Sequence, residues 1–265
     1  METTAPSPFP YLLTNQKLLH LVRHAQGLHN LEAEMKRDPV QYTDAALSPL
    51  GWQQVREQRE NVSASGMLQG IEVVITSPLL RTLQTSVGLF GREEHQDHCR
   101  NTASTLNHPP IIATELCRER MSKGRSRASI SQCRSGFPQV DFSLIESEDD
   151  ILWEADERET NEAVAARGIN FIKWLLTRKE REIAVVSHGV FLQETLITLK
   201  NKCLPLMDGD PFSRFGNCEI RSVIVFNESV KGLRTNYYCG RIPKGLSLHK
   251  FSAKENVSVD EVTYQ

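Results

Sequence analysis

The chain has 265 residues, of which 39% are hydrophobic and 24% are charged, and its formal net charge at pH 7 is -2. This balance argues against bulk nucleic-acid binding, and no apolar run reaches the roughly 18 to 20 residues of a membrane helix. Six cysteines without a C-x-x-C pair favour reduced thiols over disulfides or a structural zinc site. We therefore expect a soluble, cytoplasmic protein that forms one α/β domain over residues 1–265.

The first predicted strand, Leu18–Val22, follows residues 1–15, which we expect to be a loose leader without a secretion signal. The strand runs into Arg23 and His24. A neutral imidazole is a good nucleophile toward phosphorus, and a guanidinium binds two phosphate oxygens at once. The pair is common at strand ends, so it indicates a phosphate site only if companion residues exist.

Two helix starts follow, each with a serine cap and a proline in the first turn. Ser48 precedes one helix, and the predicted strand Ile71–Thr76 runs into Ser77-Pro78 and a second helix that ends near Gly91. This places Arg81 in an opening helical turn, where free N–H groups and the helix dipole favour phosphate. The alternative is an exposed arginine on a solvated face.

Further along, a packing helix is predicted from about Thr160 to Leu176, followed by a buried strand, Ile183–Val186. His188 and Gly189 come directly after that strand. The histidine could donate a hydrogen bond to a phosphoryl oxygen or orient the first imidazole, and it could equally be a capping or core residue. The glycine allows a close approach of the backbone to a ligand.

The alternation of strands and helices predicts a mainly parallel central sheet flanked by helices on both faces. Parallel strands share their carboxyl edge, which is where such sheets bind ligands. The junctions at His24, Arg81 and His188 are therefore expected to meet in one crevice.

Four ordered motifs carry a family resemblance. The segments Arg23–Asn30, Leu47–Gly51, Ser77–Thr85 and Ser187–Gly189 resemble those of the histidine phosphatase superfamily, in its phosphoglycerate mutase-like branch.

The resemblance implies that His24 is the phosphorylated nucleophile and that no metal or other cofactor is needed. It also implies a phosphate pocket formed by Arg23, Asn30, Arg81, His188 and Gly189. A general acid must protonate the departing oxygen. Glu119 is preferred for this role and Glu115 is the alternative, although either glutamate could instead form a surface ion pair with Arg118 or Arg120.

Two features depart from the family pattern. Ala25 stands where glycine is usual, and it fits only if its φ angle is negative. The segment at about 120–159 is expected to be an inserted cap over the crevice. Its basic residues could bind a second anionic group of the substrate or simply confer solubility; they are Arg120, Lys123, Arg125, Arg127 and Arg134.

Other segments carry weaker signals. His95, His98 and Cys99 are zinc-ligand types, but no fourth ligand follows at a suitable spacing, so a solvated loop is predicted. Residues 241–265 are predicted to be an irregular tail.

The hypothesis from the sequence is phosphoryl transfer through a phosphohistidine, most simply hydrolysis of a small phosphomonoester in carbohydrate or related metabolism. One alternative is a phosphoglycerate mutase, an isomerase with the same intermediate. Another is a weakly active or inactive protein that binds a phospho-ligand. The expected partner is a small phosphorylated metabolite, and the sequence predicts no oligomeric state.

Overall fold

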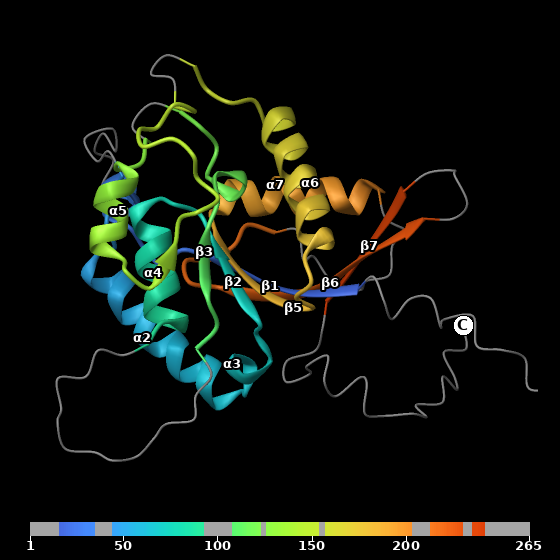
Figure 1. The fold of residues 1–265 in the computed structure, drawn as a ribbon, viewed down its shortest axis with the longest axis horizontal. Helices are drawn as coiled ribbons and strands as arrows, with labels where there is room; N and C mark the ends of the chain where they lie inside the picture. Colours follow the sequence, from blue (N-terminus) through green and yellow to red (C-terminus); the bar gives the residue numbers. More distant parts are fainter. Residues whose placement is uncertain are drawn as a thin grey trace, which may run out of the picture.

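The computed structural model describes residues 16–34, 44–92, 108–122, 126–153, 157–202, 213–229 and 235–241. Within these ranges, seven strands form one sheet in the order β4-β3-β2-β5-β1-β6-β7 (Figure 1). The strands are β1 (Gln16–Arg23), β2 (Val73–Thr76), β3 (Ile111–Ala113), β4 (Val140–Asp141), β5 (Glu182–Ser187), β6 (Ile220–Ser229) and β7 (Thr235–Arg241). The leader predicted at 1–15 lies outside the described residues. The irregular tail was predicted to begin at residue 241, but Arg241 is the last residue of β7, and residues 242–265 lie outside the described residues.

The strands from β4 to β1 are parallel, which confirms the predicted mainly parallel sheet. β6 adds to β1 in the antiparallel sense, and β7 pairs with β6 in the same way. This antiparallel edge was not predicted. The order places β5 between β1 and β2, so the three strands that end in the motif residues are neighbours.

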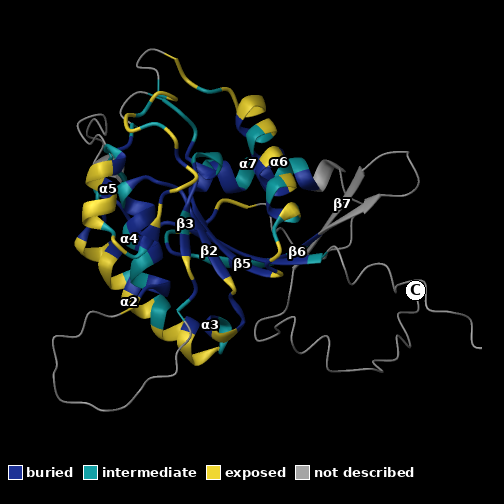
Figure 2. Cartoon of the chain, in the orientation of Figure 1, coloured by how far each residue is buried: buried dark blue, intermediate teal, exposed yellow. Residues whose placement is uncertain are grey.

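Helices cover both faces of the sheet, as predicted (Figure 1). α6 (Asn161–Thr177) and α7 (Gly189–Lys202) cover one face, while α2 (Pro49–Ala64), α4 (Leu80–Phe90) and α5 (Ile130–Gly136) pack over the other. The remaining helical pieces are α1 (Leu28–Glu34), α3 (Met67–Gly70) and the 3-10 turn η2 (Glu115–Cys117). In Figure 2 the strands at the centre are buried, and exposed residues lie on the outer faces of the helices, among them α2, α5 and α6.

Local sequence explains where most of these helices begin. The side chains of Ser48 and Thr160 accept hydrogen bonds from the first turns of α2 and α6, and Ser129 forms a capping box on α5. The predicted start of α4 at Ser77-Pro78 is wrong. That helix begins at Leu80, because the side chain of Asp44 accepts a hydrogen bond of 2.6 Å from the Leu80 amide.

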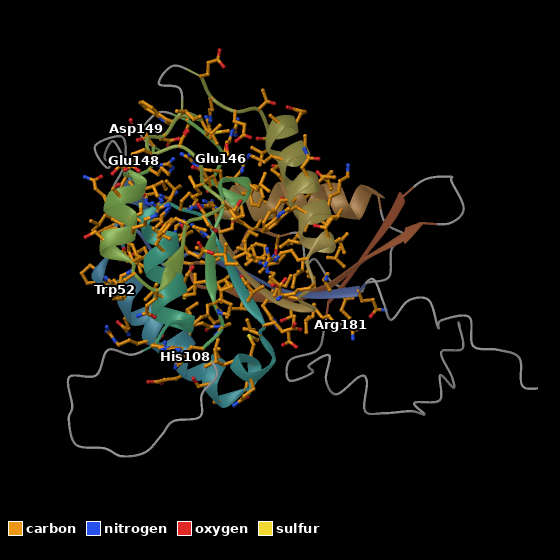
Figure 3. The ribbon with its side chains drawn as sticks, viewed as in Figure 1. Trp52, His108, Glu146, Glu148, Asp149 and Arg181 are labelled. Carbon is orange, nitrogen blue, oxygen red and sulfur yellow. The ribbon has the colours of Figure 1, made fainter. Side chains whose placement is uncertain are left out.

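Part of the expected cap, 120–159, belongs to the central architecture. β4 extends the sheet beside β3, and α5 packs on the same face as α4 through Ile130 and Cys133. The loop around Glu146, Glu148 and Asp149 lies beyond α5 (Figure 3). The segment therefore contributes an edge strand and a helix to the central fold, and its remaining described part includes a loop beyond α5.

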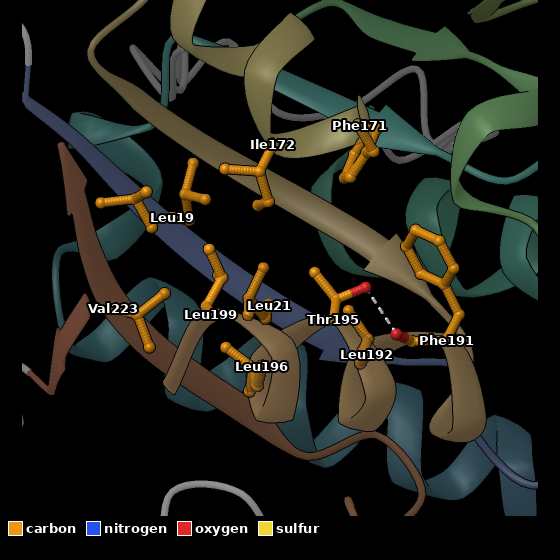
Figure 4. Close-up of a pocket in the computed structure, with 11 residues that line it drawn as sticks. Leu19, Leu21, Phe171, Ile172, Phe191, Leu192, Thr195, Leu196, Leu199 and Val223 are labelled. Carbon is orange, nitrogen blue, oxygen red and sulfur yellow. Dashed lines mark hydrogen bonds between the residues drawn. The ribbon is translucent and has the colours of Figure 1, made fainter. Parts of the chain in front are cut away.

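A small cavity lies in the core between the sheet and helices α6 and α7 (Figure 4). Its lining is apolar apart from Thr195, whose hydroxyl donates a hydrogen bond of 2.7 Å to the Phe191 carbonyl. Because it offers no anion-binding group, we assign it to packing and to no ligand. Among the described helices, none has the length and apolar character needed to cross a bilayer.

Candidate functional site

The motif residues meet at the carboxyl edge of three adjacent strands. Arg23 pairs in register with Ser187 of β5, and Thr76 of β2 pairs with Val186, so the three strands end at the same level. The chain then continues into His24, into α4 and into α7. The structure thus brings together the three junctions that the sequence predicted to converge.

His24 is buried and its imidazole is held in one tautomer. Nδ1 lies 2.7 Å from the carbonyl oxygen of Ala25, which can only accept, so Nδ1 carries the proton. Nε2 then has the lone pair, and it accepts from Nε of Arg81 at 3.3 Å. Burial, followed by the charges of Arg81 and His29, lowers the pKa of His24 well below its ordinary value of 6.5. The ring is therefore neutral at neutral pH.

Arg81 and His188 form the second side of the site. The Arg81 guanidinium donates to Nδ1 of His188 at 3.2 Å, so the other ring nitrogen, Nε2, carries the proton toward the Ser77 hydroxyl at 2.9 Å. The His188 ring meets that of His24 edge-on, with 5.2 Å between centroids. His188 is a buried residue, as the capping or core alternative required, and it also faces the first histidine.

Arg23 reaches into the same space with donor capacity left over. One terminal nitrogen donates to the Phe215 carbonyl at 2.6 Å, while the buried Nε has no hydrogen-bond partner among the described residues. Burial and the nearby Arg214 lower the pKa of Arg23, and Glu119 opposes them. A Cβ at Gly189 would lie only 3.2 Å from that Nε, so the glycine gives the guanidinium room.

A turn at residues 213–221 supports the end of β1 and His24, and the sequence analysis did not predict it. The Cys218 amide donates to the His24 carbonyl at 3.2 Å, the Asn217 side chain donates to the same oxygen at 3.3 Å, and the Arg23 amide donates to the Glu219 carbonyl at 3.2 Å. Arg221 fixes the turn itself, because it stacks over Phe215 and binds the Glu219 carboxylate. Contacts of this kind use backbone atoms and have no residue signature.

Asn30 and His29 lie at the start of α1, close to the nucleophile. Oδ1 of Asn30 accepts from the Gly27 amide at 3.1 Å and from the Asn217 side chain at 3.5 Å. The His29 ring lies 5.6 Å from that of His24. Asn30 thus orders the loop after the nucleophile, and His29 is a site residue that the sequence analysis missed. Its position beside Asn30 in the opening motif was the available signal.

Ala25 meets the condition set for an alanine at this position. Among the described residues other than glycine, only Asp44 and Cys218 have a positive φ, so the Ala25 backbone is unstrained. Its methyl group is fully buried in the core beside α2 and α4, and its amide donates to the Thr85 hydroxyl at 3.1 Å. The backbone turn beside the histidine therefore forms without glycine.

Glu119 follows η2 and turns its carboxylate toward the first turn of α7. Its Oε1 accepts from the Phe191 amide at 3.3 Å and from the Arg120 amide at 2.9 Å. The residue is 8% exposed and is electrostatically coupled to Arg23. Glu119 is therefore a buried group at the site and not a residue of the surface.

Glu115, the alternative acid, is held in an ion-pair network. Its two oxygens pair with Arg127 at 2.6 Å and with Arg118 at 3.1 Å, and Arg118 also binds both oxygens of Asp150 at 2.7 Å. Because each carboxylate oxygen of Glu115 is already paired with a guanidinium group, neither oxygen is available to a leaving group. This geometry favours Glu119 over Glu115.

The cap arginines that the structure describes are partly used for structure. Arg127 is buried, and besides Glu115 it binds backbone carbonyls within 128–149. Arg134 is exposed in the last turn of α5, while Lys123 and Arg125 lie outside the described residues. Arg127 therefore does not fit the idea that the basic cluster binds substrate, because its guanidinium is buried and donates to Glu115 and to backbone carbonyls.

No group of metal-ligand side chains is found within the described ranges. His95, His98 and Cys99 lie outside them. A neutral histidine flanked by two buried arginines at the carboxyl edge of a parallel sheet is an arrangement suited to phosphoryl transfer.

Comparison with known proteins agrees with this class. Residues 19–236 match the histidine phosphatase superfamily (branch 1), and the chain belongs to that superfamily. Phosphoglycerate mutase-like protein 1 of Arabidopsis thaliana is 46% identical over 262 residues, covering 90% of this chain and 92% of its own length. A second Arabidopsis phosphoglycerate mutase-like protein is 42% identical over 258 residues, covering 89% and 95%.

Among solved structures, a protein described as mycobacterial hydrolase 1 superposes with a TM-score of 0.52 at 16% identity, covering 88% of this chain and 99% of its own. This likeness supports the fold. The chain is thus a phosphoryl-transfer enzyme of the histidine phosphatase superfamily, similar over nearly its whole length to phosphoglycerate mutase-like proteins.

Proposed function

We propose that the protein hydrolyses a small phosphomonoester through a phosphohistidine formed on Nε2 of His24. The observation that carries the proposal is the hydrogen bond from Nδ1 of His24 to the Ala25 carbonyl, which leaves the Nε2 lone pair directed toward Arg81. A pKa lowered well below 6.5 keeps this nitrogen unprotonated at neutral pH. Position and protonation state therefore both suit a nucleophile.

In the first step, a bond forms between Nε2 of His24 and phosphorus while the bond from phosphorus to the ester oxygen breaks. Glu119 gives its proton to that departing oxygen, so the leaving group departs as a neutral alcohol. Arg23 and Arg81 bind the equatorial oxygens. Asn30 joins them, and so does His188 when its Nε2–H exchanges the Ser77 hydroxyl for a phosphoryl oxygen. These donors stabilise the charge of the transferring group.

In the second step, a water oxygen bonds to phosphorus and the bond to Nε2 breaks. Glu119, now ionised, takes the proton of that water, so inorganic phosphate leaves and the acid regains its starting form. Gly189 at the start of α7 leaves space for Arg23 to follow the phosphoryl group. The cycle needs only side chains of this chain and one water molecule.

Hydrolysis is preferred to isomerisation because of the cap. A mutase must hold the acceptor hydroxyl of a charged substrate and exclude water. Arg127 and Arg118 bind Glu115, Asp150 and backbone carbonyls, so these two cations serve the fold. The names of the Arabidopsis relatives keep phosphoglycerate mutase activity as the second candidate.

A protein that only binds a phospho-ligand is a weaker candidate. Its support in the sequence was Ala25, and the negative φ of this residue removes the objection to catalysis. A binding protein also gains nothing from a buried carboxyl group that interacts with Arg23. Glu119, buried against α7, supports turnover.

The proposed substrate is a small phosphorylated metabolite of carbohydrate or related metabolism, and the proposed location is the cytoplasm. Support for a reducing compartment comes from Cys117, Cys133 and Cys218, which are buried free thiols. Burial raises the pKa of Cys133 to about 11 and that of Cys218 to about 12, so neither is a reactive thiolate.

One assay separates the three readings. The protein is incubated with a panel of phosphomonoesters, and separately with 3-phosphoglycerate plus 2,3-bisphosphoglycerate, while phosphate release and isomer formation are followed together. Phosphate release without isomer formation supports hydrolysis, and the reverse supports a mutase. Silence in both channels would overturn the proposed chemistry in favour of a binding protein.

A further inference from the structure

Arg167 of α6 forms hydrogen bonds with the backbone of the segment that carries Glu119. Its guanidinium donates to the carbonyl oxygens of Leu116 at 3.2 Å, Arg118 at 2.7 Å and Glu119 itself at 3.3 Å. A single side chain thus binds the carbonyls before, beside and at the proposed acid. Nothing in the chemistry described so far uses this arginine.

The opposite side of the same guanidinium is closed by Glu159. Nε of Arg167 donates to one oxygen of that carboxylate at 3.0 Å and a terminal nitrogen donates to the other at 2.7 Å. Glu159 in turn accepts from the Met121 amide at 3.0 Å, and its carbonyl accepts from Arg120 at 2.7 Å. The two ends of the cap segment are therefore fastened together at the point where Glu119 enters the site.

The guanidinium also lies 4.9 Å above the ring of Phe191. The amide of Phe191 is one of the two donors to Oε1 of Glu119. Arg167 thus contacts both the backbone of the acid and the residue that orients its carboxylate. A planar fork can satisfy these partners together, whereas a lysine ammonium is a single point of charge.

We propose that Arg167 is a positioning residue for the general acid, and that it acts by fixing the Glu119 carboxyl at the place where the leaving oxygen departs. The inference rests on the proposed role of Glu119. Displacing a catalytic group by about 1 Å can lower a rate by about a hundredfold. Loss of the Arg167 hydrogen bonds should therefore slow the proton transfer from Glu119 before it affects any other step. None of the hydrogen bonds given above joins Arg167 to His24, Arg23 or Arg81.

The test is the dependence of rate on the leaving group. An acid contributes when the departing oxygen is a strong base, as in an alkyl phosphate, and little when it is a weak base, as in a dinitrophenyl phosphate. Formation of the phosphoenzyme in a single turnover is measured with glycerol phosphate, phenyl phosphate and a dinitrophenyl phosphate. This first half-reaction is common to a phosphatase and a mutase.

Arg167→Met is expected to slow phosphoenzyme formation from the alkyl phosphate by about a hundredfold and from the dinitrophenyl phosphate by less than about threefold. Glu119→Gln should show the same dependence on the leaving group, with a larger loss on the alkyl phosphate. Arg167→Lys, which keeps the charge without the fork, should fall between Arg167→Met and the wild type. Equal losses on all three substrates, or none, would overturn the proposal. If Arg167→Met does not fold, Arg167→Lys and Glu159→Gln give the same comparison.

Arg178→Met is the matched control. Arg178 follows α6, pairs with Glu180 at 2.8 Å and lies 5.2 Å above the ring of Trp174. It therefore has the carboxylate and aromatic contacts of Arg167 away from the site, without the hydrogen bonds to the Glu119 segment. Its leaving-group dependence should equal that of the wild type. If the wild type forms no phosphoenzyme, the proposed function is refuted. If the wild type forms it and Arg167→Met shows the same leaving-group dependence as the wild type, only the positioning role is refuted.

Discussion

Nδ1 of His24 donates a hydrogen bond of 2.7 Å to the carbonyl oxygen of its neighbour Ala25. A backbone carbonyl has no proton to give, so this contact alone assigns the tautomer of the ring. It also makes the backbone conformation of residue 25 part of the site. The chain therefore orients its proposed nucleophile locally, before any distant residue contributes.

Replacing the nucleophile should abolish the chemistry. His24→Ala is expected to lower turnover by more than about a thousandfold and to remove the acid-labile phosphoenzyme, which is trapped by rapid quenching and quantified with labelled phosphate. His108→Gln is the control, because His108 precedes β3 at the amino edge of the sheet, where its ring lies 3.4 Å from the Phe90 carbonyl at the end of α4. Full activity in His24→Ala would refute the mechanism.

In the pH profile of kcat/KM, the decline on the acid side should lie below pH 6.5. Because the folded state lowers the pKa of His24, the ring stays neutral while an ordinary histidine is protonated, and kcat/KM falls only when the pH drops below the folded pKa. His29→Asn removes one neighbouring positive charge and should move this decline to higher pH. An NMR titration of the His24 ring nitrogens, without substrate, checks both statements.

The same shift affects stability, with a definite sign. The unfolded chain takes up a proton on His24 near pH 6.5, while the folded chain does so only at lower pH, so His24 makes stability fall as the pH drops through that interval. Urea unfolding at a series of pH values should show a shallower decline for His24→Phe than for the wild type. Parallel curves would contradict the assigned direction.

Gly51 is expected to tolerate no side chain. A Cβ there would overlap the carbonyl oxygen of Gln26, which lies in the loop after the nucleophile and accepts the Ser48 amide. Gly51→Ala should cost about 1–3 kcal/mol of unfolding free energy and lower kcat as the loop shifts. Gly136→Ala, where a methyl group meets nothing within 4 Å, should be neutral or slightly stabilising in the same urea titration.

Arg127 should behave as a structural residue. Arg127→Met leaves Glu115 with one partner fewer in a buried network, and we expect a loss of about 3 kcal/mol in unfolding free energy. KM values for singly and doubly phosphorylated substrates should then change by the same factor. Arg134→Met, on the exposed face of α5, should change stability by less than about 0.5 kcal/mol. A KM rise confined to the doubly phosphorylated substrates would show that Arg127 binds substrate.

The convergence of the site was predictable because it depends on topology. His24, Arg81 and His188 each lie in the segment that follows a buried strand, and parallel strands must end at one edge. The residues that fix their geometry were not predictable. Asp44 determines where α4 begins from 36 positions away, and Asn217 supports His24 through a carbonyl oxygen.

Burial was the second quantity that the sequence did not contain. Arg127 and Arg134 read alike in a basic stretch, yet one is enclosed by carbonyl oxygens and the other is exposed. The antiparallel pair β6 and β7 was also missed, because nothing in Ile220–Ser229 distinguishes an antiparallel strand from a parallel one. Charge and pattern identify candidate residues, and the fold decides which of them face the ligand.

The turn at residues 213–221 has a consequence for the newly made protein. Its amides and carbonyls hold Arg23 and His24 through hydrogen bonds between residues far apart in the chain, such as Arg23 with Glu219 and His24 with Asn217. In a ribosome-bound chain that ends before Ser213, His24 has already emerged from the ribosome, but the groups that orient it have not yet been made. We expect such a chain to form no phosphohistidine, because the turn that orients Arg23 and His24, and the strand β6 that pairs with β1, have not yet been made.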